Sequence, residues 1–192
     1  MACIDELDAL RGLLGCIQAD GVQVSDAILE EKNEAKLKKL TISKLAPGML
    51  LLATDEGRKR DNAPACMSPL FKNDGDYDQN RVCDAVLLRK VSDGLHVYYI
   101  ELKSDSPSGY EGQFLSTHCF MRYVALLSEK LCGFRIHISR ERYIVFHTDS
   151  SNKRPRGRKE RTRFKPQSAN TPATPDMFCV TNGDTVRCTE FF

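Results

Sequence analysis

The stretch that decides the fold is residues 82–103, which read VCDAVLLRKVSDGLHVYYIELK. Two apolar runs rich in Val, Leu, Ile and Tyr flank the tripeptide SDG at 92–94, which is typical of a tight turn. We therefore predict a β-hairpin with strands at 82–91 and 95–103. Pairing in such a hairpin brings the start of the first strand opposite the end of the second strand.

On the C-terminal side of the hairpin, the sequence predicts a helix and more strand material. Apolar residues recur at helical spacing between about 110 and 131, and Gly133 ends that helix. Residues 134–138 and 143–148 are strand candidates, which form either one long bent strand or a pair of strands.

On the N-terminal side, apolar spacing predicts a short amphipathic helix over residues 4–18. A second helix, with charged residues over most of its surface, is expected to run from a cap at 25–26 to about Leu40. After a Pro-Gly break, residues 49–54 are expected to form a short buried strand, and the polar stretch 55–80 a long loop or an insertion.

Two features mark the C-terminal part of the chain. Residues 149–176 contain no Val, Ile, Leu or Met and one aromatic residue, Phe164, which predicts a mobile loop or linker. Residues 177–181 and 185–189 then flank an Asn-Gly pair, which is a strong signal for a hairpin.

In this order the elements predict an α/β fold in a single domain, residues 1–192. A small mixed β-sheet with flanking helices would form an αβββαβ core over about 24–148. One extra N-terminal helix precedes this core, and a basic flexible segment (about 149–176) and a C-terminal hairpin (177–192) follow it. At 192 residues the chain is long enough to bury one hydrophobic core.

Bulk composition favours a soluble protein that is kept in a reducing compartment. The hydrophobic fraction is 41% and the charged fraction 28%, and no apolar run is long enough to span a membrane. The sequence has no secretory signal and no CxxC or Cys/His metal-binding spacing, so its eight cysteines are expected to be mostly buried free thiols. We therefore expect a cytoplasmic protein that does not bind a membrane.

The residues that carry chemistry lie where the predicted hairpin strands pair. Glu101 and Lys103 are two positions apart in a strand and therefore share a face. Asp84 interrupts an apolar run, where an unpaired carboxylate is costly to bury, and strand pairing places it near Glu101 and Lys103. Two carboxylates and a strand carbonyl suit a hard cation such as Mg²⁺. The ammonium group of Lys103 can hold a water molecule and offset charge on a phosphorane-like transition state.

The pattern Asp84-x16-Glu101-x-Lys103, on two hairpin strands followed by a helix, resembles the PD-(D/E)xK (restriction-endonuclease-like) nuclease superfamily. The superfamily shares an αβββαβ core, and the resemblance covers roughly residues 24–148. It implies hydrolysis of nucleic-acid phosphodiester bonds with Mg²⁺ or Mn²⁺, with Asp84 and Glu101 as metal ligands and Lys103 as the water-positioning residue. Position 83 is Cys, where the motif has a proline in many members.

The resemblance also implies further site residues. Gln113, in the first turn of the helix after the motif, matches a glutamine that several branches of the superfamily direct at the site, and a plain surface glutamine is the alternative. Some members use a glutamate from the helix before the sheet, and the candidates for it are Glu30, Glu31 and Glu34. The alternative for each of these glutamates is a position on a solvated helix face.

A basic segment is the second candidate for function. Residues 153–165 carry eight basic side chains and one acid, Glu160, so this window has a charge of +7 and leaves −5 for the rest of the chain. Such a segment can follow a phosphate backbone by charge, and Phe164 can stack on a base, whereas the alternative is a solvated linker or a sorting signal. The candidate nucleic-acid-binding residues are Lys153, Arg154, Arg156, Arg158, Lys159, Arg161, Arg163 and Lys165.

Three interpretations of different class are consistent with these features. The first is a Mg²⁺- or Mn²⁺-dependent nuclease, an endonuclease on DNA or RNA, that acts as the catalytic subunit or effector of a larger system. The chain has little room for a sequence-reading domain, so a protein partner, nucleic-acid structure or a homodimer would choose the target. The second is an inactive module of the same fold that binds nucleic acid or a protein without cutting. The third is an unrelated α/β interaction protein. The retention of Asp84, Glu101 and Lys103 together favours the enzyme.

Overall fold

The computed structural model describes residues 6–30, 37–54, 79–104, 107–148 and 168–192. Within these ranges the protein is a mixed α/β structure with two α-helices and two β-sheets. The elements in chain order are α1 (Glu6–Leu13), β1 (Ile17–Asp20), β2 (Asp26–Glu30), β3 (Lys39–Ser43), β4 (Met49–Ala53), β5 (Ala85–Val91), β6 (Gly94–Lys103), α2 (Glu111–Leu127), the π-helical turn η3 (Ser128–Cys132), β7 (Ile138–His147), β8 (Asp176–Cys179), β9 (Thr185–Arg187) and the 3₁₀ helix η4 (Cys188–Phe191).

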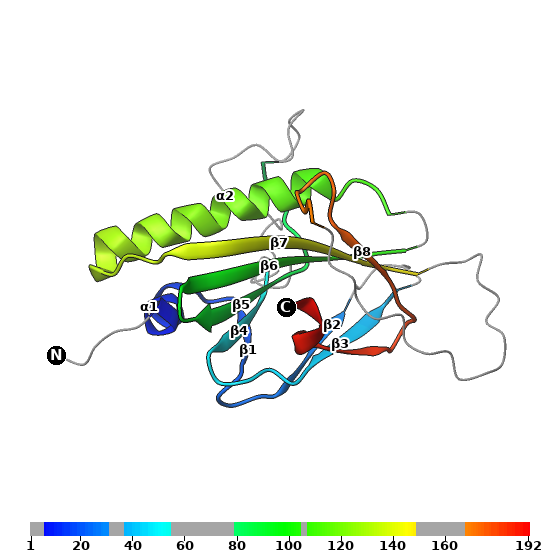
Figure 1. Cartoon of the computed structure of the whole chain (residues 1–192), viewed down its shortest axis with the longest axis horizontal. Helices are drawn as coiled ribbons and strands as arrows, with labels where there is room; N and C mark the ends of the chain where they lie inside the picture. The colour runs from blue at the N-terminus through cyan, green and yellow to red at the C-terminus, as the bar shows by residue number, and fades with distance from the viewer. Residues whose placement is uncertain (1–5, 31–36, 55–78, 105–106, 149–167) are drawn as a thin grey trace, which may run out of the picture.

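The larger sheet is mixed and has the strand order β1-β4-β5-β6-β7-β8, and the smaller sheet has the order β2-β3-β9. Strands β4, β5 and β6 form an antiparallel meander, after which α2 crosses over and β7 pairs parallel to β6. Figure 1 shows α2 lying across one face of the larger sheet, with β2, β3 and the C-terminal 3₁₀ helix on the other side. Neither described helix is long and apolar enough to span a membrane.

The predicted central hairpin is confirmed. Strands β5 and β6 pair antiparallel from Ala85 opposite Ile100 to Val91 opposite Gly94. A glycine is required at the turn, because Gly94 has a φ of +132° and a Cβ there would lie 2.5 Å from the carbonyl oxygen of His137. The helix predicted at about 110–131 is also found, as α2 and η3, and the strand material after it is one strand, β7.

Strands β5 and β6 are buried on both faces, so they divide the interior into two cores. Tyr98 and Ile100 of β6 pack toward the smaller sheet, against residues such as Leu40 and Ile42 of β3. Val97 and Tyr99 face the opposite way and pack with Phe114, Met121 and Val124 of α2. This alternation fixes which face each polar side chain of β6 can reach.

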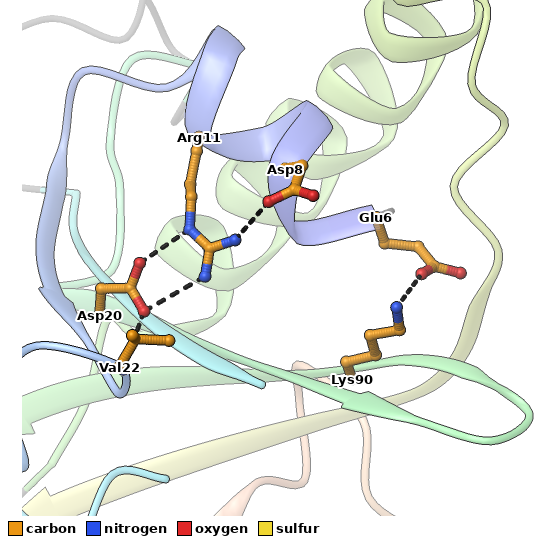
Figure 2. A network of polar contacts seen from close by, with 6 residues as sticks. All are labelled: Glu6, Asp8, Arg11, Asp20, Val22 and Lys90. Atoms are coloured by element: carbon orange, nitrogen blue, oxygen red, sulfur yellow. Dashed lines mark hydrogen bonds and ion pairs between the residues drawn. The ribbon is translucent and has the colours of Figure 1, made fainter. Parts of the chain in front are cut away.

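The N-terminal helix is shorter than the sequence predicted. Helix α1 ends at Leu13, and residues 17 and 18, expected to be helical, belong to strand β1 beside β4. Figure 2 shows how α1 is tied down. Arg11 donates from Nε to Asp20 Oδ2 at 2.7 Å, from Nη2 to Asp20 Oδ1 at 3.2 Å, and from Nη1 to Asp8 at 2.7 Å, while Lys90 Nζ of β5 lies 3.4 Å from Glu6 Oε2.

The second predicted helix, over about 26–40, is wrong where the structure describes it. Residues 26–30 and 39–43 are the antiparallel strands β2 and β3, and residues 31–36 lie outside the described ranges. Side chains in β2 alternate between exposed and buried positions, and Ala27 and Leu29 point inward. This alternation with a period of two is typical of a half-buried strand. Strand β3 also pairs with the distant strand β9, which completes the smaller sheet. The helix that precedes the meander is therefore α1.

The predicted C-terminal hairpin is also wrong. Gly183 adopts a φ of +83° and Asp184 donates its N–H to Thr181, so a turn forms at the Asn-Gly pair. However, β8 before the turn pairs parallel with β7 in the larger sheet, whereas β9 after it pairs parallel with β3 in the smaller sheet. The side chain of Asn182 accepts from the backbone N–H groups of Lys38 and Lys39 at 2.8 Å, which holds the turn over the smaller sheet.

The predicted loop over 149–176 ends earlier than expected. Residues 149–167 lie outside the described ranges, but the segment from 168 onward is packed against β7. Asn170 exchanges two hydrogen bonds with the backbone of Tyr143, and the buried Asp176 forms an ion pair with the buried Arg142 at 2.7 Å. Polar composition alone therefore does not mark this segment as a linker, because its polar groups have partners on β7.

Of the eight cysteines, six lie in the described ranges, and all six are free thiols. Cys83 and Cys188 are buried, Cys16 is partly buried, and Cys119, Cys132 and Cys179 are exposed. The expectation of free thiols is confirmed for these six, but the expectation that most of them are buried is wrong. The exposed thiols lie in α2, in η3 and at the end of β8.

Candidate metal-binding catalytic site

The last residues of β6 carry the first two candidate side chains. Glu101 is 2% exposed and lies on the face of β6 that packs under α2, because it is two residues after Tyr99. Lys103 extends the same row and places its Nζ 2.7 Å from Glu101 Oε1. The strand geometry predicted for Glu-x-Lys therefore brings the carboxylate and the ammonium group together.

Helix α2 adds the predicted glutamine to this pair. Gln113, in the first turn of α2, accepts a hydrogen bond from Lys103 Nζ through Oε1 at 2.8 Å. Its Nε2 donates to the carbonyl oxygen of Val82 at 3.1 Å. Gln113 is thus not a plain surface residue, because it joins the end of β6 to the chain that leads into β5.

Asp84 lies one residue before β5, whose first residue, Ala85, pairs with Ile100 of β6. Its Oδ2 accepts a hydrogen bond of 2.6 Å from the backbone N–H of Leu102, the residue between Glu101 and Lys103. Asp84 is partly exposed, and it also borders a small pocket together with Gln18, Glu30 and Ala53. The structure therefore brings Asp84, Glu101, Lys103 and Gln113 to one end of the β5–β6 pair.

The segment 79–84 is fixed by side chains that the sequence did not single out. The hydroxyl of Thr117, which is fully buried in α2, accepts from the backbone N–H of Cys83 at 2.9 Å. Ser116 donates to the carbonyl oxygen of Gln79 at 2.9 Å, and Thr54 after β4 donates to the carbonyl oxygen of Cys83. Four-residue spacing from Gln113 on the helix face was the only sequence signal for Thr117.

Burial and local charge act in opposite directions on Glu101. Burial raises the pKa of the Glu101 carboxyl group to about 7, against the opposing effects of Lys103, of Gln113 and of the backbone N–H of Asp84. Within the described residues, Glu101 Oε2 is buried without a hydrogen-bond partner. Burial also raises the pKa of Cys83 to about 12, so this thiol stays neutral at physiological pH and is a poor nucleophile.

The donor set fits a hard divalent cation. Mg²⁺ in proteins is held by one or two carboxylates and keeps several water molecules. Within the described residues, the buried Glu101 Oε2 without a hydrogen bond is the kind of oxygen that it binds, and Asp84 Oδ2 lies 2.6 Å from the backbone nitrogen of the next residue, Leu102. Over the described ranges there is no group of three or more His, Cys, Asp or Glu side chains placed to hold a metal ion. A cation here would therefore depend on water or substrate oxygens for the rest of its coordination.

The remaining predicted site residues are not brought to the site in the same way. Glu30, at the end of β2, has its carboxylate 3.9 Å from Lys39 and shares with Asp84 the small pocket described above. Glu31, Glu34 and the eight basic residues of 153–165 lie outside the described ranges. The chain enters the stretch 149–167 beside the site, because the N–H of Thr148 donates to the carbonyl oxygen of Lys103 at 3.3 Å.

Comparison with protein-family models, curated proteins and solved structures finds no match to this chain. Its function is therefore inferred from the arrangement of Asp84, Glu101, Lys103 and Gln113.

Proposed function

We propose that the protein is a metal-dependent nuclease that hydrolyses phosphodiester bonds of DNA or RNA. The observation that carries this proposal is the buried carboxylate of Glu101. One of its oxygens lies beside Lys103 Nζ, and the other has no hydrogen-bond partner among the residues that the structure describes. Burying a carboxylate is costly, and an unpartnered oxygen adds to that cost. A cation bound to this oxygen would offset the cost of burying it. An ion pair with Lys103 alone does not, because it leaves the second oxygen without a partner.

The finer fold assignment, an αβββαβ core of the restriction-endonuclease-like kind, belongs to the same proposal. In this interpretation α1 is the first helix, β4, β5 and β6 are the three strands, and α2 and β7 complete the core. The antiparallel meander followed by a helix and a parallel strand supports it. The β2–β3 pair and the two C-terminal strands would then be additions to the core.

In the proposed mechanism, Asp84 and Glu101 would hold Mg²⁺ or Mn²⁺, which would supply Lewis acidity and lower the pKa of a bound water molecule. Lys103 places a positive charge beside Glu101, where it can orient a water molecule and offset negative charge that develops on the phosphoryl group. Gln113 holds the Lys103 ammonium group through Oε1 and so limits the positions that this group can take.

The charge distribution supports nucleic acid as the substrate class. The basic window at 153–165 begins five residues after Thr148, whose N–H is bonded to Lys103. Phosphate-binding charge is thereby connected to the candidate catalytic residues by a short length of chain.

The direct test is incubation of the purified protein with labelled single- and double-stranded DNA and RNA in Mg²⁺, Mn²⁺ or EDTA. A circular substrate belongs in the panel, because only an endonuclease can cut it. We expect cleavage that needs the metal and that falls at least about a hundredfold in Asp84→Ala, Glu101→Ala and Lys103→Ala. Glu129→Ala, which removes an exposed carboxylate in η3, is the control and should cut like the parent.

Two results would count against the enzyme. Cleavage that persists in Asp84→Ala would mean that this carboxylate does not take part. Binding of nucleic acid without cleavage in any metal would favour the inactive binding module.

A further inference from the structure

The outward face of α2 carries a regular stripe of exposed side chains. Figure 1 shows α2 along the outside of the larger sheet. Among the described residues outside α2 and the loop before it, Ala173 borders a pocket with Glu111 and Leu115 at the start of the helix. Leu115 and Leu126 are 48% and 51% exposed on this face. We define the outer stripe by its exposed residues, spaced by 4, 4, 3, 4 and 4 positions: Glu111, Leu115, Cys119, Arg122, Leu126 and Lys130.

The outer stripe is palindromic about a point between Phe120 and Met121. At equal distances on either side of this point, Leu115 matches Leu126, and Cys119 matches Arg122. The outermost match is between opposite charges, Glu111 at the start of α2 and Lys130 in η3. A two-fold axis perpendicular to the helix at this point would therefore bring each residue opposite its match in a second copy.

We propose that α2 pairs antiparallel with α2 of a second copy of the chain, around a two-fold axis between Phe120 and Met121. Leu115 then packs on Leu126 of the partner subunit, which removes exposed apolar area from water. Glu111 meets Lys130 of the partner subunit, and the antiparallel helix dipoles attract each other. The same patch serves both subunits, as an isologous interface requires.

Charge near the axis does not oppose this pairing. Arg122 donates from Nη2 to Glu141 Oε2 of β7 at 2.6 Å, and Glu141 also lies 3.0 Å from His118. The positive charge of Arg122 is therefore already offset within its own subunit. Tyr123, which is exposed beside the outer stripe, borders an apolar groove formed with Leu13 and Leu14 at the end of α1 and so widens the apolar surface.

The predicted dimer is weak and has a defined geometry. One pair of helices about 30 Å long buries an area at the lower end of specific interfaces, so we expect a dissociation constant in the micromolar range or weaker. Gln113 lies about 11 Å along the helix from the axis. If the proposed function holds, two candidate sites lie at opposite ends of the interface, related by the symmetry that also relates the strands of a duplex.

The test is a disulfide that only the antiparallel register can form. In Arg122→Cys, the introduced cysteine faces Cys119 of the partner subunit, so mild oxidation should give a covalent dimer, with peptide mapping assigning the bridge to these two positions. Arg122→Ser, which loses the same ion pair but gains no thiol, should stay uncrosslinked. A bridge that maps to Cys16, Cys132 or Cys179 instead would overturn the register.

Sedimentation equilibrium tests the interface without a new thiol, metal or nucleic acid, so its outcome is independent of whether the protein is a nuclease. Leu126→Glu should weaken association at least about tenfold, because it places a charge against Leu115 of the partner subunit. Glu111→Lys should also weaken it, and Glu111→Lys combined with Lys130→Glu should restore it. A parent protein that stays monomeric at millimolar concentration, or a Leu126→Glu variant that associates equally well, would refute the proposal.

Discussion

Glu101 is the residue at which burial and function conflict most directly. Its carboxylate sits under α2 with Lys103 on one oxygen and no hydrogen bond on the other, within the described residues. Burial raises the pKa of this group to about 7. Between about pH 5 and pH 7, the folded metal-free protein therefore keeps a proton on Glu101, whereas the unfolded chain has lost it. The folded state therefore loses stability as pH rises through this window.

This sign leads to a prediction for stability. In EDTA, the free energy of unfolding should contain a contribution from Glu101 that is present at pH 5 and lost by pH 8, worth about 1.4 kcal/mol for each unit of pKa shift. Glu101→Gln keeps the shape of the side chain and cannot ionise. The free energy of unfolding of this variant minus that of the parent should therefore be larger at pH 8 than at pH 5. Urea unfolding at both pH values measures this difference, and an equal effect at the two values would show that Glu101 is not held in its uncharged form.

At the residue scale, much of the site was predictable from the sequence. Glu101 and Lys103 share a face because a strand repeats every two residues, and the SDG turn sets which end of the hairpin Asp84 meets. Thr117 was not predictable, because its contact depends on where the backbone of Cys83 passes α2. Hydrogen bonds between a side chain and a distant backbone group leave little trace in local sequence.

At the scale of elements, α2 and the segment before β5 act as one support for the site. Thr117 holds the N–H of Cys83, Gln113 holds the carbonyl oxygen of Val82, and Asp84 follows directly. If α2 shifts relative to this segment, the position of Asp84 against Leu102 changes with it. We therefore regard Thr117 as a positioning residue.

Thr117→Val tests this role. The substitution keeps the volume but leaves the buried N–H of Cys83 without an acceptor, which should cost about 1–3 kcal/mol of stability. We expect kcat for cleavage to fall at least about tenfold with little change in KM, because the carboxylate is displaced and the rest of the substrate surface is not. Thr117→Ser retains the hydroxyl and should recover most of kcat. Equal activity of the Val and Ser variants would show that the hydroxyl does not position Asp84.

The elements that sequence analysis missed are those set by pairing between distant segments. Strand β2 and the start of β3 were predicted to be helical, and β3 pairs with β2 and with the far C-terminal strand β9. The segments on either side of Gly183 fit a hairpin locally, yet β8 joins β7 and β9 joins β3. Local propensity is a weak prior in such cases, because the free energy comes from burial between sheets that no short window contains.

At the scale of the whole molecule, charge is concentrated in one place. The window 153–165 has a charge of +7 in a chain whose net charge is +2. If this window contacts phosphates, its contribution should appear in the salt dependence of binding.

Neutralising Arg154, Arg156, Arg158 and Lys159 together should weaken nucleic-acid binding and make the plot of log affinity against log salt shallower by up to about three units. Thermal stability should hardly change, because the segment 153–165 contains no Val, Ile, Leu or Met to bury in a core. Four exposed Lys or Arg residues elsewhere, such as Lys38, Lys44, Arg135 and Arg140, provide a variant with the same change in net charge. If both variants lose affinity equally, net charge and not this segment is responsible.

The central claim is that Asp84 and Glu101 form one cation site beside Lys103, and Mn²⁺ binding tests it without knowledge of the substrate. Electron paramagnetic resonance of free Mn²⁺ during titration of the protein gives the number of sites and their affinity. We predict one site that competes with Mg²⁺, that is lost in Asp84→Ala and in Glu101→Gln, and that is kept or strengthened in Lys103→Ala, because Lys103 neutralises Glu101 in the metal-free protein. Absence of binding at millimolar Mn²⁺, or a site that survives both carboxylate substitutions, would contradict the claim.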